Sequence, residues 1–368
     1  MRYYVIAGEA SGDLHGSMLI KALKDRDVDA KIRFWGGDAM ADVSGKAPVK
    51  HISELAIMGF VEVVTHLRQV IGNMFFCKKD ILSFSPDVVI GVDYPGFNLK
   101  IERWAHRRGI KTVHFISPNL WAWKQGRIKQ MKDNLDALCY ILPFEQDFFK
   151  VRGMQQSYYV GHPLVDSVGN YQGTHLDTGG KPIIALLPGS RRQELHRSLP
   201  LMVELASRHK EYRFIVAGMS LIDRSVYDKY ISTSDNVELL IDRTYDILLS
   251  AYAAVVCSGT ATLETALFNV PQVVCYAANP VSICIAKALV NRRIKYISLV
   301  NLIADQPVVT ELLQQEFNTA RLEQEFAAIV VNMESRNRMQ QQYAYVRSLL
   351  GDGGAANRVA EIVISLVR

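Results

Sequence analysis

Short runs of β-branched and apolar residues alternate with helical patterns along nearly the whole chain. Runs such as DVVIGVD and KTVHFIS have the length and composition of strands, and segments 14–24 and 97–108 have helical spacing. Repeated alternation of this kind is typical of a parallel sheet with helices on both faces. The sequence therefore predicts the α/β class, with a doubly wound sheet.

The alternation stops once, at residues 169–181, where GNYQGTHLDTGGK has no apolar period and is rich in Gly, Thr and Asn. It restarts with PIIALLPGS. A chain of 368 residues also exceeds what one hydrophobic core usually supports. We therefore predict two Rossmann-like domains, at 1–168 and 182–340, joined by a linker at 169–181. Ligands of open α/β sheets collect at the carboxyl ends of strands, which favours a cleft between the two domains.

The strand in VIGVDYPGFNLK ends in a charge, Asp93. Pro95 keeps a helix from starting at once, so Asp93 would stand at the carboxyl end of the sheet. A carboxylate near an apolar wall can stay ionised and still be basic enough to take a proton. We interpret Asp93 as a catalytic base; the structural alternative is a cap for the helix that begins near Phe97.

The first strand runs into GEASGD, at residues 8–13, which opens the first helix. Small residues let backbone amides approach a ligand, and a helix N-terminus favours anions. The stretch lacks the G-x-G-x-x-G spacing of a dinucleotide site. A tight turn capped by Ser11 or Asp13 remains the structural alternative.

A similar turn, LLPGSRRQE, lies in the second half of the chain. Gly189 and Ser190 can present backbone amides to an anion, and Arg191 can pair bidentately with a phosphate.

A third turn, CSGTATLETA, would place Ser258, Gly259 and Thr260 at a helix start. Glu264, one turn into that helix, could bind both hydroxyls of a ribose; the alternative is a well-capped helix. Two anion-binding turns in one domain predict a nucleotide site there.

The stretch ISPNLWAWKQGR follows a strand and contains Trp121 and Trp123 beside Lys124 and Arg127. The two tryptophans could be core anchors. At the carboxyl end of a strand, a wall for a sugar or a lipid is the other interpretation.

Residues 56–79 are unusually apolar. Val64, Leu67 and Ile71 share one helical face, and Val61 and Phe75 extend the apolar surface beyond an ordinary core stripe. Cationic residues flank the segment: Arg68, Lys78 and Lys79. Both a buried helix and an element that binds a membrane surface fit this pattern.

Composition excludes several classes of function. The net charge of +5, from 42 basic and 37 acidic residues, suits anionic small molecules or an acidic membrane surface, and dense basic runs typical of nucleic-acid binding are missing from the sequence. Five dispersed cysteines without a C-x-x-C pair predict a reducing cytoplasm, and scattered histidines predict no metal site. MRYYVIA leads directly into a motif, which predicts no signal peptide. We expect a soluble protein or one held at a membrane surface.

Taken in order, the motifs resemble the lipid-A-disaccharide synthase family over nearly the whole chain. The matching stretches are GEASGD, ELAIMGFVEV, PDVVIGVDYPGFN, HFISPNLWAW, LPFE, YVGHP, LLPGSR, SGTATLE, YISLVNLIA and ELLQ. The chain departs from the family pattern at two positions. Asp38 replaces the proline of the family's G-G-P, and Val300 replaces the proline of its S-L-P-N. Gly96 stands where some members carry an acid.

The resemblance implies the GT-B fold, with terminal helices at 341–368 that pack back on the first domain. It also implies an inverting transfer of 2,3-diacylglucosamine from UDP-2,3-diacylglucosamine to 2,3-diacylglucosamine 1-phosphate (lipid X), which forms a β-1,6-linked disaccharide and UDP. In-line attack needs a base, and Asp93 matches the family's residue. Asn301 matches a position near the donor, and Ser11 and Gly12 fit the acceptor side.

The same resemblance gives the apolar segment a purpose, because both substrates carry acyl chains. It implies a protein peripheral on the cytoplasmic face of the inner membrane. Without a metal cluster, Arg191 and the glycine turns would have to meet the diphosphate charge, and no cofactor is expected. Rival interpretations are another UDP-sugar enzyme of the same fold, such as a 2-epimerase or a soluble-acceptor glycosyltransferase, and a non-catalytic nucleotide-binding regulator. The oligomeric state stays open, a homo-oligomer being one option.

Overall fold

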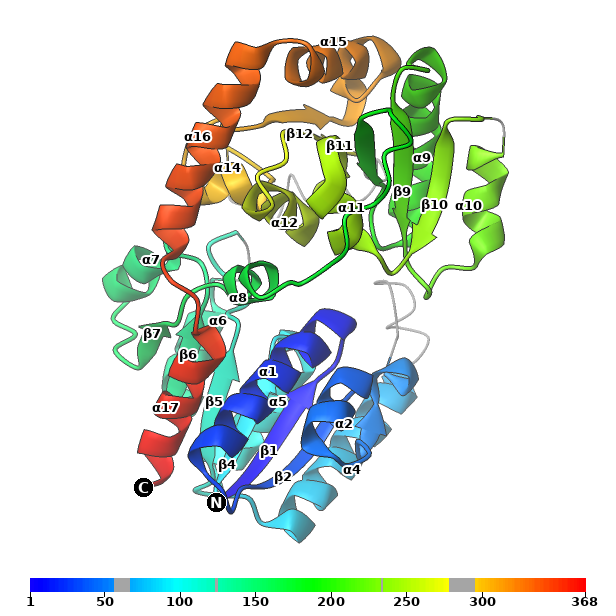
Figure 1. Ribbon diagram of the computed structural model, residues 1–368. Coiled ribbons are helices and arrows are strands. Elements are labelled where there is room, and N and C mark those ends of the chain that lie inside the picture. Colours follow the sequence, from blue (N-terminus) through cyan, green and yellow to red (C-terminus); the bar gives the residue numbers. More distant parts are fainter. Residues whose placement is uncertain (56–66, 123–124, 233, 278–294) are drawn as a thin grey trace. The chain divides into compact units, whose positions relative to one another are not determined.

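The computed structural model describes residues 1–55, 67–122, 125–232, 234–277 and 295–368. The chain forms two compact units. The first comprises Met1–Pro163 together with Gly353–Arg368, and the second comprises Leu164–Asp352. Each contains a parallel sheet flanked by helices (Figure 1). The α/β class and the doubly wound sheets predicted from the alternating pattern are confirmed.

The sheet of the first unit has the strand order β3-β2-β1-β4-β5-β6-β7. Its strands are β1 (Arg2–Ala7), β2 (Lys31–Gly36), β3 (Lys50–His51), β4 (Val88–Val92), β5 (Lys111–Phe115), β6 (Ala137–Tyr140) and β7 (Ser157–Tyr159). The helices are α1 (Ala10–Arg26), α2 (Asp38–Ser44), α4 (Leu67–Phe84), α5 (Pro95–His106), α6 (Arg127–Asn134), α7 (Glu145–Val151) and α17 (Ala355–Val367), with a short 3-10 helix at Ile52–Glu54. The order reverses between β1 and β4, and in open α/β sheets such a reversal marks the ligand crevice.

The sheet of the second unit has the order β10-β9-β8-β11-β12-β13 and reverses between β8 and β11. Its strands are β8 (Ile183–Leu187), β9 (Arg213–Gly218), β10 (Val237–Ile241), β11 (Ala251–Cys257), β12 (Gln272–Tyr276) and β13 (Thr310–Leu313). The helices are α8 (Pro163–Gly169), α9 (Arg192–Arg208), α10 (Arg224–Ile231), α11 (Thr244–Ser250), α12 (Thr260–Leu267), α14 (Leu299–Ala304), α15 (Thr319–Val330) and α16 (Met333–Leu350), with a 3-10 helix at Gln314–Glu316.

Central strands read as continuous apolar runs because helices cover both faces of each sheet. Every residue of β4 and of β8 is buried. In the first unit the core includes Tyr4 and Trp35, whose polar atoms are satisfied: the Trp35 Nε1 donates to the Tyr4 hydroxyl at 2.9 Å, and that hydroxyl donates to Asp80 at 2.7 Å.

The chain crosses between the units after Pro163 and again after Asp352, whereas the sequence pattern placed these boundaries at 169 and 341. The segment read as a linker packs on the second unit, where the Tyr171 hydroxyl donates to Asp246 at 2.7 Å. Helix α16 also belongs to the second unit, and α17 packs against α1 in the first. There Arg26 pairs with Glu361 at 2.9 Å. Composition reveals a break in periodicity, but not which domain the intervening residues pack on.

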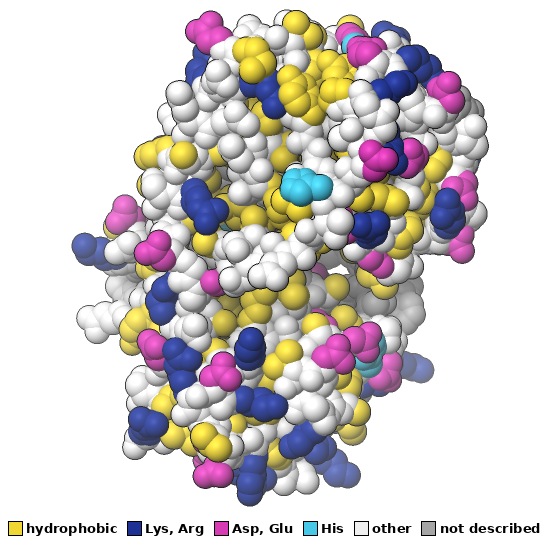
Figure 2. Space-filling model, viewed as in Figure 1, with side chains coloured by type: hydrophobic (Ala, Val, Ile, Leu, Met, Phe, Trp, Pro, Cys, Tyr) yellow, Lys and Arg dark blue, Asp and Glu magenta, His cyan; other side chains and the backbone are white. Residues whose placement is uncertain are grey.

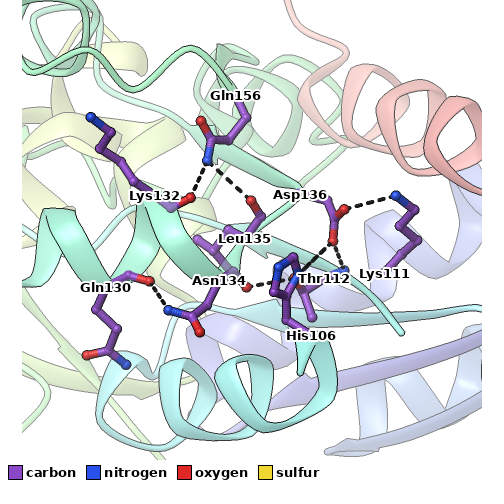
Figure 3. A network of polar contacts seen from close by, with 9 residues as sticks. All are labelled: His106, Lys111, Thr112, Gln130, Lys132, Asn134, Leu135, Asp136 and Gln156. Carbon is purple, nitrogen blue, oxygen red and sulfur yellow. Dashed lines mark hydrogen bonds and ion pairs between the residues drawn. The ribbon is translucent and has the colours of Figure 1, made fainter. Parts of the chain in front are cut away.

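The amino end of β5 is held by a polar network around Asp136 (Figure 3). The Asp136 carboxylate accepts hydrogen bonds from the Thr112 amide at 2.9 Å and from Lys111 at 3.0 Å, and it lies 3.3 Å from His106. Burial by itself raises the pKa of Asp136, but the bonds from Lys111 and Thr112 outweigh it and the pKa lies below its ordinary value. At this end of the sheet, the negative charge of Asp136 is therefore balanced by Lys111.

On the face drawn in Figure 2, Lys and Arg side chains are interspersed with Asp and Glu over both units, so that face presents no continuous basic patch. Within the described ranges, none of the helices combines the length and the apolar character that a membrane span requires.

Candidate active site

Asp93 directly follows β4, at the point where the first sheet reverses its strand order. Its backbone amide donates to the Phe115 carbonyl at the end of β5, at 2.8 Å. Asp93 and Tyr94 have φ angles of 47° and 50°, and Ile116 on the neighbouring strand end has φ 72°. Non-glycine residues rarely adopt such angles, and a β-branched one is a clear outlier. Backbone strain of this kind clusters at functional sites.

A cavity of about 190 Å³ opens beside Asp93. At about 30 Å³ per water molecule this is room for roughly six waters, comparable to one sugar ring. The lining includes Asp93, the strained Ile116, Ser117, Asn119 and Arg127. A carboxylate, two neutral polar side chains and a guanidinium therefore share one small cavity in the first unit.

The electrostatic setting of Asp93 suits a base. Burial raises the pKa of Asp93, the positive charge of His114 opposes this rise, and Glu9 adds to it; the net pKa lies above its ordinary value. A carboxylate with a raised pKa holds a proton more readily after accepting it, as a general base must.

His114 and Glu102 form a pair beneath this site that the sequence reasoning missed. Both side chains are buried, and the His114 Nδ1 lies 2.7 Å from a Glu102 oxygen. Burial by itself lowers the pKa of His114, but Glu102 outweighs it and the pKa is raised. Within the described residues, the other ring nitrogen of His114 and the second Glu102 oxygen have no hydrogen-bond partner. Two features of the sequence could have indicated this pair. One is a histidine inside the apolar run KTVHF, and the other is a glutamate in the helix that precedes that run.

Gly91 provides the space for this pair. It pairs with His114 across β4 and β5, and a Cβ at Gly91 would lie 2.2 Å from the nearer Glu102 oxygen. Asn98 fixes the strand end from the same side, since its amide donates to the Asp93 carbonyl at 2.7 Å and to the Ile6 carbonyl at 3.1 Å.

The GEASGD turn lies against the Asp93 turn. A Cβ on Gly8 would lie 2.4 Å from the Tyr94 ring, and a Cβ on Gly12 would lie 3.5 Å from the Val92 carbonyl oxygen. Ser11 is exposed. The structure thus brings Ser11 and Gly12 to the strand ends that carry Asp93.

Asp13, which the sequence offered as a cap for its own turn, holds a different helix. Its carboxylate accepts the amides of Gly37 at 2.6 Å and Ala39 at 3.0 Å and thereby caps the start of α2. The start of α2 at Asp38, where the chain departs from the family pattern, is fixed by this carboxylate.

Trp121 is half-buried, and its ring meets Phe144 edge-on with 5.2 Å between centroids. Its indole nitrogen is buried without a hydrogen-bond partner among the described residues. Trp123 lies outside the described residues. Of the two tryptophans in the predicted wall, the structure therefore describes Trp121 only.

In the second unit, the LLPGSRRQE turn follows β8 at the reversal point and closes on an acid of its own chain. The Glu194 carboxylate accepts the amides of Ser190 at 3.1 Å and Arg191 at 3.3 Å, and it pairs with the Arg191 guanidinium at 3.2 Å. Gly189 has φ 104°, which favours glycine, and a Cβ there would meet Glu194 at 2.6 Å. The turn therefore has the donors for an anion and already holds a carboxylate.

The CSGTATLETA turn follows β11, the strand that pairs with β8. The Ser258 amide donates to the Cys275 carbonyl at 2.8 Å, while Gly259 and Thr260 are exposed. Glu264 accepts a hydrogen bond from the Tyr245 hydroxyl at 2.8 Å. Burial raises the pKa of Glu264, and the Tyr245 bond opposes the rise. The structure thus places the two predicted nucleotide turns at adjacent strand ends.

Asn301 is buried, and its side chain is occupied by its own chain. Its amide nitrogen donates to the Val309 carbonyl and to Glu311, each at 2.9 Å, and its oxygen accepts the amides of Val308 at 2.8 Å and Val309 at 2.9 Å. The Ser258 hydroxyl donates to the Ile297 carbonyl at 3.3 Å, which ties this segment to the third turn. Asn301 thus anchors a loop beside the turn, a packing role that could not be predicted from the sequence.

The apolar segment is described only from residue 67, where α4 begins; Val61 and Val64 lie outside the described residues, and so does the Leu67 side chain. Ile71 and Phe75 are exposed, at 45% and 70%, whereas Cys77 is fully buried in the core. Helix α4 is therefore apolar on its outward face as well as on its inward face. Within the described residues, no three His, Cys, Asp or Glu side chains gather as a metal site would require.

Two parallel α/β units, each with sequence motifs at its reversal point, define a two-domain Rossmann-like fold. The structure resembles a UDP-GlcNAc 2-epimerase from Neisseria meningitidis solved with UDP-GlcNAc (TM-score 0.70, 12% identity, 99% of this chain and 100% of that chain). It also resembles the glycosyltransferase of kitacinnamycin (TM-score 0.68, 15% identity, 100% and 99%). At these identities the likeness shows the fold, which is that of GT-B glycosyltransferases and epimerases.

The family follows from sequence. The model of the lipid-A-disaccharide synthetase family matches residues 3–363. Lipid-A-disaccharide synthases from Syntrophus aciditrophicus and Nitrosococcus oceani are 36% and 35% identical; the alignments cover 99% of this chain in each case, and 97% and 95% of the relatives. The chain belongs to this family. It is a glycosyltransferase that forms the lipid A disaccharide, and the epimerase, soluble-acceptor and regulator alternatives are not favoured.

Proposed function

We propose that the first unit binds the acceptor and that Asp93 removes the proton from its attacking hydroxyl. The reaction is the transfer of 2,3-diacylglucosamine from UDP-2,3-diacylglucosamine to the primary hydroxyl of lipid X. The observation that carries this assignment is a half-buried carboxylate with a raised pKa, held on a strained turn beside a cavity of sugar size. In-line attack on an α-linked donor inverts the anomeric centre, so the product linkage is β-1,6.

The second unit supplies the donor site in this proposal. The leaving diphosphate needs positive charge and oriented amides, and the turn at Gly189–Arg191 offers both. We propose that this turn, together with the Ser258–Thr260 turn, takes that charge without a metal ion. Turnover should then survive excess EDTA; a loss that magnesium restores would contradict this part of the proposal.

A membrane role is proposed for α4 and the apolar residues before it. Ile71 and Phe75 are exposed one helical turn apart, and Arg68 and Lys79, also exposed, could meet anionic headgroups at about 1 kcal/mol each. Replacing Ile71 and Phe75 together by Ser should release the protein from anionic vesicles without lowering its melting temperature, because neither side chain is in the core. Unchanged vesicle binding by the folded double variant would contradict docking through this face.

The decisive test of the activity is mass spectrometry of the products formed from UDP-2,3-diacylglucosamine and lipid X. We expect the disaccharide 1-phosphate and UDP in equal amounts. Release of UDP without disaccharide, or epimerisation of the donor, would contradict the proposed reaction.

A further inference from the structure

Arg127 is a cation in the Asp93 cavity that has no acidic partner among the described residues. It begins α6, is half-buried, and lines the cavity together with Asp93 and Asn119. Within the described residues it forms neither an ion pair nor a hydrogen bond through its side chain. The Asn119 side chain likewise has no partner within those residues.

Neighbouring Arg152 shows the opposite arrangement. It donates to the Phe148 carbonyl at 3.1 Å and to Gln125 at 3.2 Å, and its guanidinium lies 3.9 Å from the centre of the Phe148 ring. Arg152 is therefore used for packing, whereas Arg127 lines the cavity of the proposed base and its guanidinium has no partner within the described residues. A guanidinium fork matches the oxygens of a phosphate or carboxylate.

The chemistry of the acceptor identifies the anion. If Asp93 takes the proton of the attacking hydroxyl, the sugar ring in this cavity is the acceptor ring. Its primary hydroxyl extends from C5 and its 1-phosphate from C1, the two carbons that flank the ring oxygen. A ring whose hydroxyl reaches Asp93 would then direct its phosphate to another part of the cavity wall.

We propose that Arg127, assisted by Asn119, binds the 1-phosphate of the acceptor and so selects phosphorylated over unphosphorylated acceptors. The inference rests on the proposed role of the first unit as the acceptor site. It adds a specificity determinant: a carboxylate contacts the primary hydroxyl of the ring, and a guanidinium binds its 1-phosphate.

The test compares two acceptors, lipid X and the same diacylglucosamine with a methyl glycoside in place of the 1-phosphate, in neutral detergent micelles. Wild type should prefer lipid X by roughly tenfold or more in kcat/KM, the size expected for a hydrogen bond to a charged group. Arg127→Ala should reduce this preference to within about threefold, and Arg127→Lys should keep part of it, because lysine retains the charge but loses the fork.

Lys129→Ala is the matched control, since Lys129 is an exposed cation on the same helix and does not line the cavity. It removes the same charge and should leave the preference unchanged. If Arg127→Ala lowers the melting temperature, the acceptor preference is measured with Arg127→Gln, which keeps most of the aliphatic stem.

Calorimetric titration with UDP separates the donor from the acceptor. Arg127→Ala should bind UDP as wild type does; a loss of UDP affinity would assign Arg127 to the donor and overturn the inference. Retention of the full preference for lipid X by a folded Arg127 variant would overturn it equally.

Equilibrium binding of both acceptors, measured without donor, makes the same comparison independently of turnover. If wild type forms no disaccharide, the proposed function fails. The phosphate preference in binding still decides the role of Arg127 in that case.

Discussion

The two charged side chains beside the opposite ends of β5 in the first unit, Asp136 and Asp93, have different surroundings. At the amino end, Asp136 is surrounded by donors that lower its pKa (Figure 3). At the carboxyl end, Asp93 has a raised pKa, its turn is strained, and His114 has a ring nitrogen without a partner in the described part of the chain. The amino end of β5 therefore adjoins a region built for stability, and its carboxyl end adjoins a region where stability is given up, as is expected where chemistry occurs.

The largest effect should come from Asp93→Asn, which keeps the size of the side chain but cannot accept the proton. Turnover should fall by roughly 10²–10⁴-fold, the usual contribution of a general base. The free energy of unfolding should stay the same or rise, because partial burial disfavours the charge that is removed. Steady-state rates, calorimetric UDP binding and chemical denaturation measure these effects. Activity within threefold of wild type would sink the assignment.

Gly8→Ala should act on the same turn from outside. Its new Cβ would lie 2.4 Å from the Tyr94 ring, so the turn that carries Asp93 must shift. A displacement of about 1 Å can cost up to roughly 10²-fold in rate. Gly96→Ala is the matched control, since a Cβ at Gly96 meets no atom within 4 Å. Equal rates for the two variants would show that the position of Tyr94 is unimportant.

At the other end of the strand, Asp136→Asn should lower stability and spare activity. Removing a charged acceptor from Lys111 and the Thr112 amide should cost about 2 kcal/mol of unfolding free energy at neutral pH. The pKa of Asp136 is lowered by folding, so its contribution is present above the unfolded pKa and is lost as pH falls through the folded pKa. Denaturation curves of variant and wild type should therefore converge in acid. A large loss of kcat in the folded variant would remove the contrast between the two ends.

The smallest effect, and the sharpest, should be a change in pH profile from Glu102→Gln. Without the Glu102 charge the pKa of His114 falls, and without a positive His114 the pKa of Asp93 rises. Because Asp93 must be ionised to act as a base, the acidic limb of kcat/KM should move to higher pH while the plateau changes little. A purely structural role for the pair would lower the melting temperature and leave the limb where it is.

The sequence was informative wherever function depends on position along one strand. The alternating pattern predicted both sheets, and Asp93, Gly189 and Ser258 could be placed because each follows an apolar run directly. Strand ends are local features. A polar or charged side chain at a strand end can be recognised from the sequence without knowing which residues surround it in the fold.

Features that depend on two distant segments could not be predicted in this way. His114 meets Glu102 because β5 lies beside β4 and α5 packs over Gly91. Asn301 matched a family position near the donor, yet its side-chain hydrogen bonds all go to residues 308–311, which only the folded loop brings within reach. Arg127 was noticed as a cation, but its lack of an acidic partner in the described part of the chain is a property of the fold.

Glu194 has a consequence for how nucleotide affinity depends on salt. Its carboxylate accepts the Ser190 and Arg191 amides and neutralises the Arg191 guanidinium. If a nucleotide phosphate binds this turn as proposed, it displaces one anion and inherits that anion's contacts. The electrostatic gain is then the difference between two anions, and fewer mobile counterions leave than a bare arginine would release. Affinity for UDP should consequently weaken less with ionic strength than the charge of the diphosphate alone suggests.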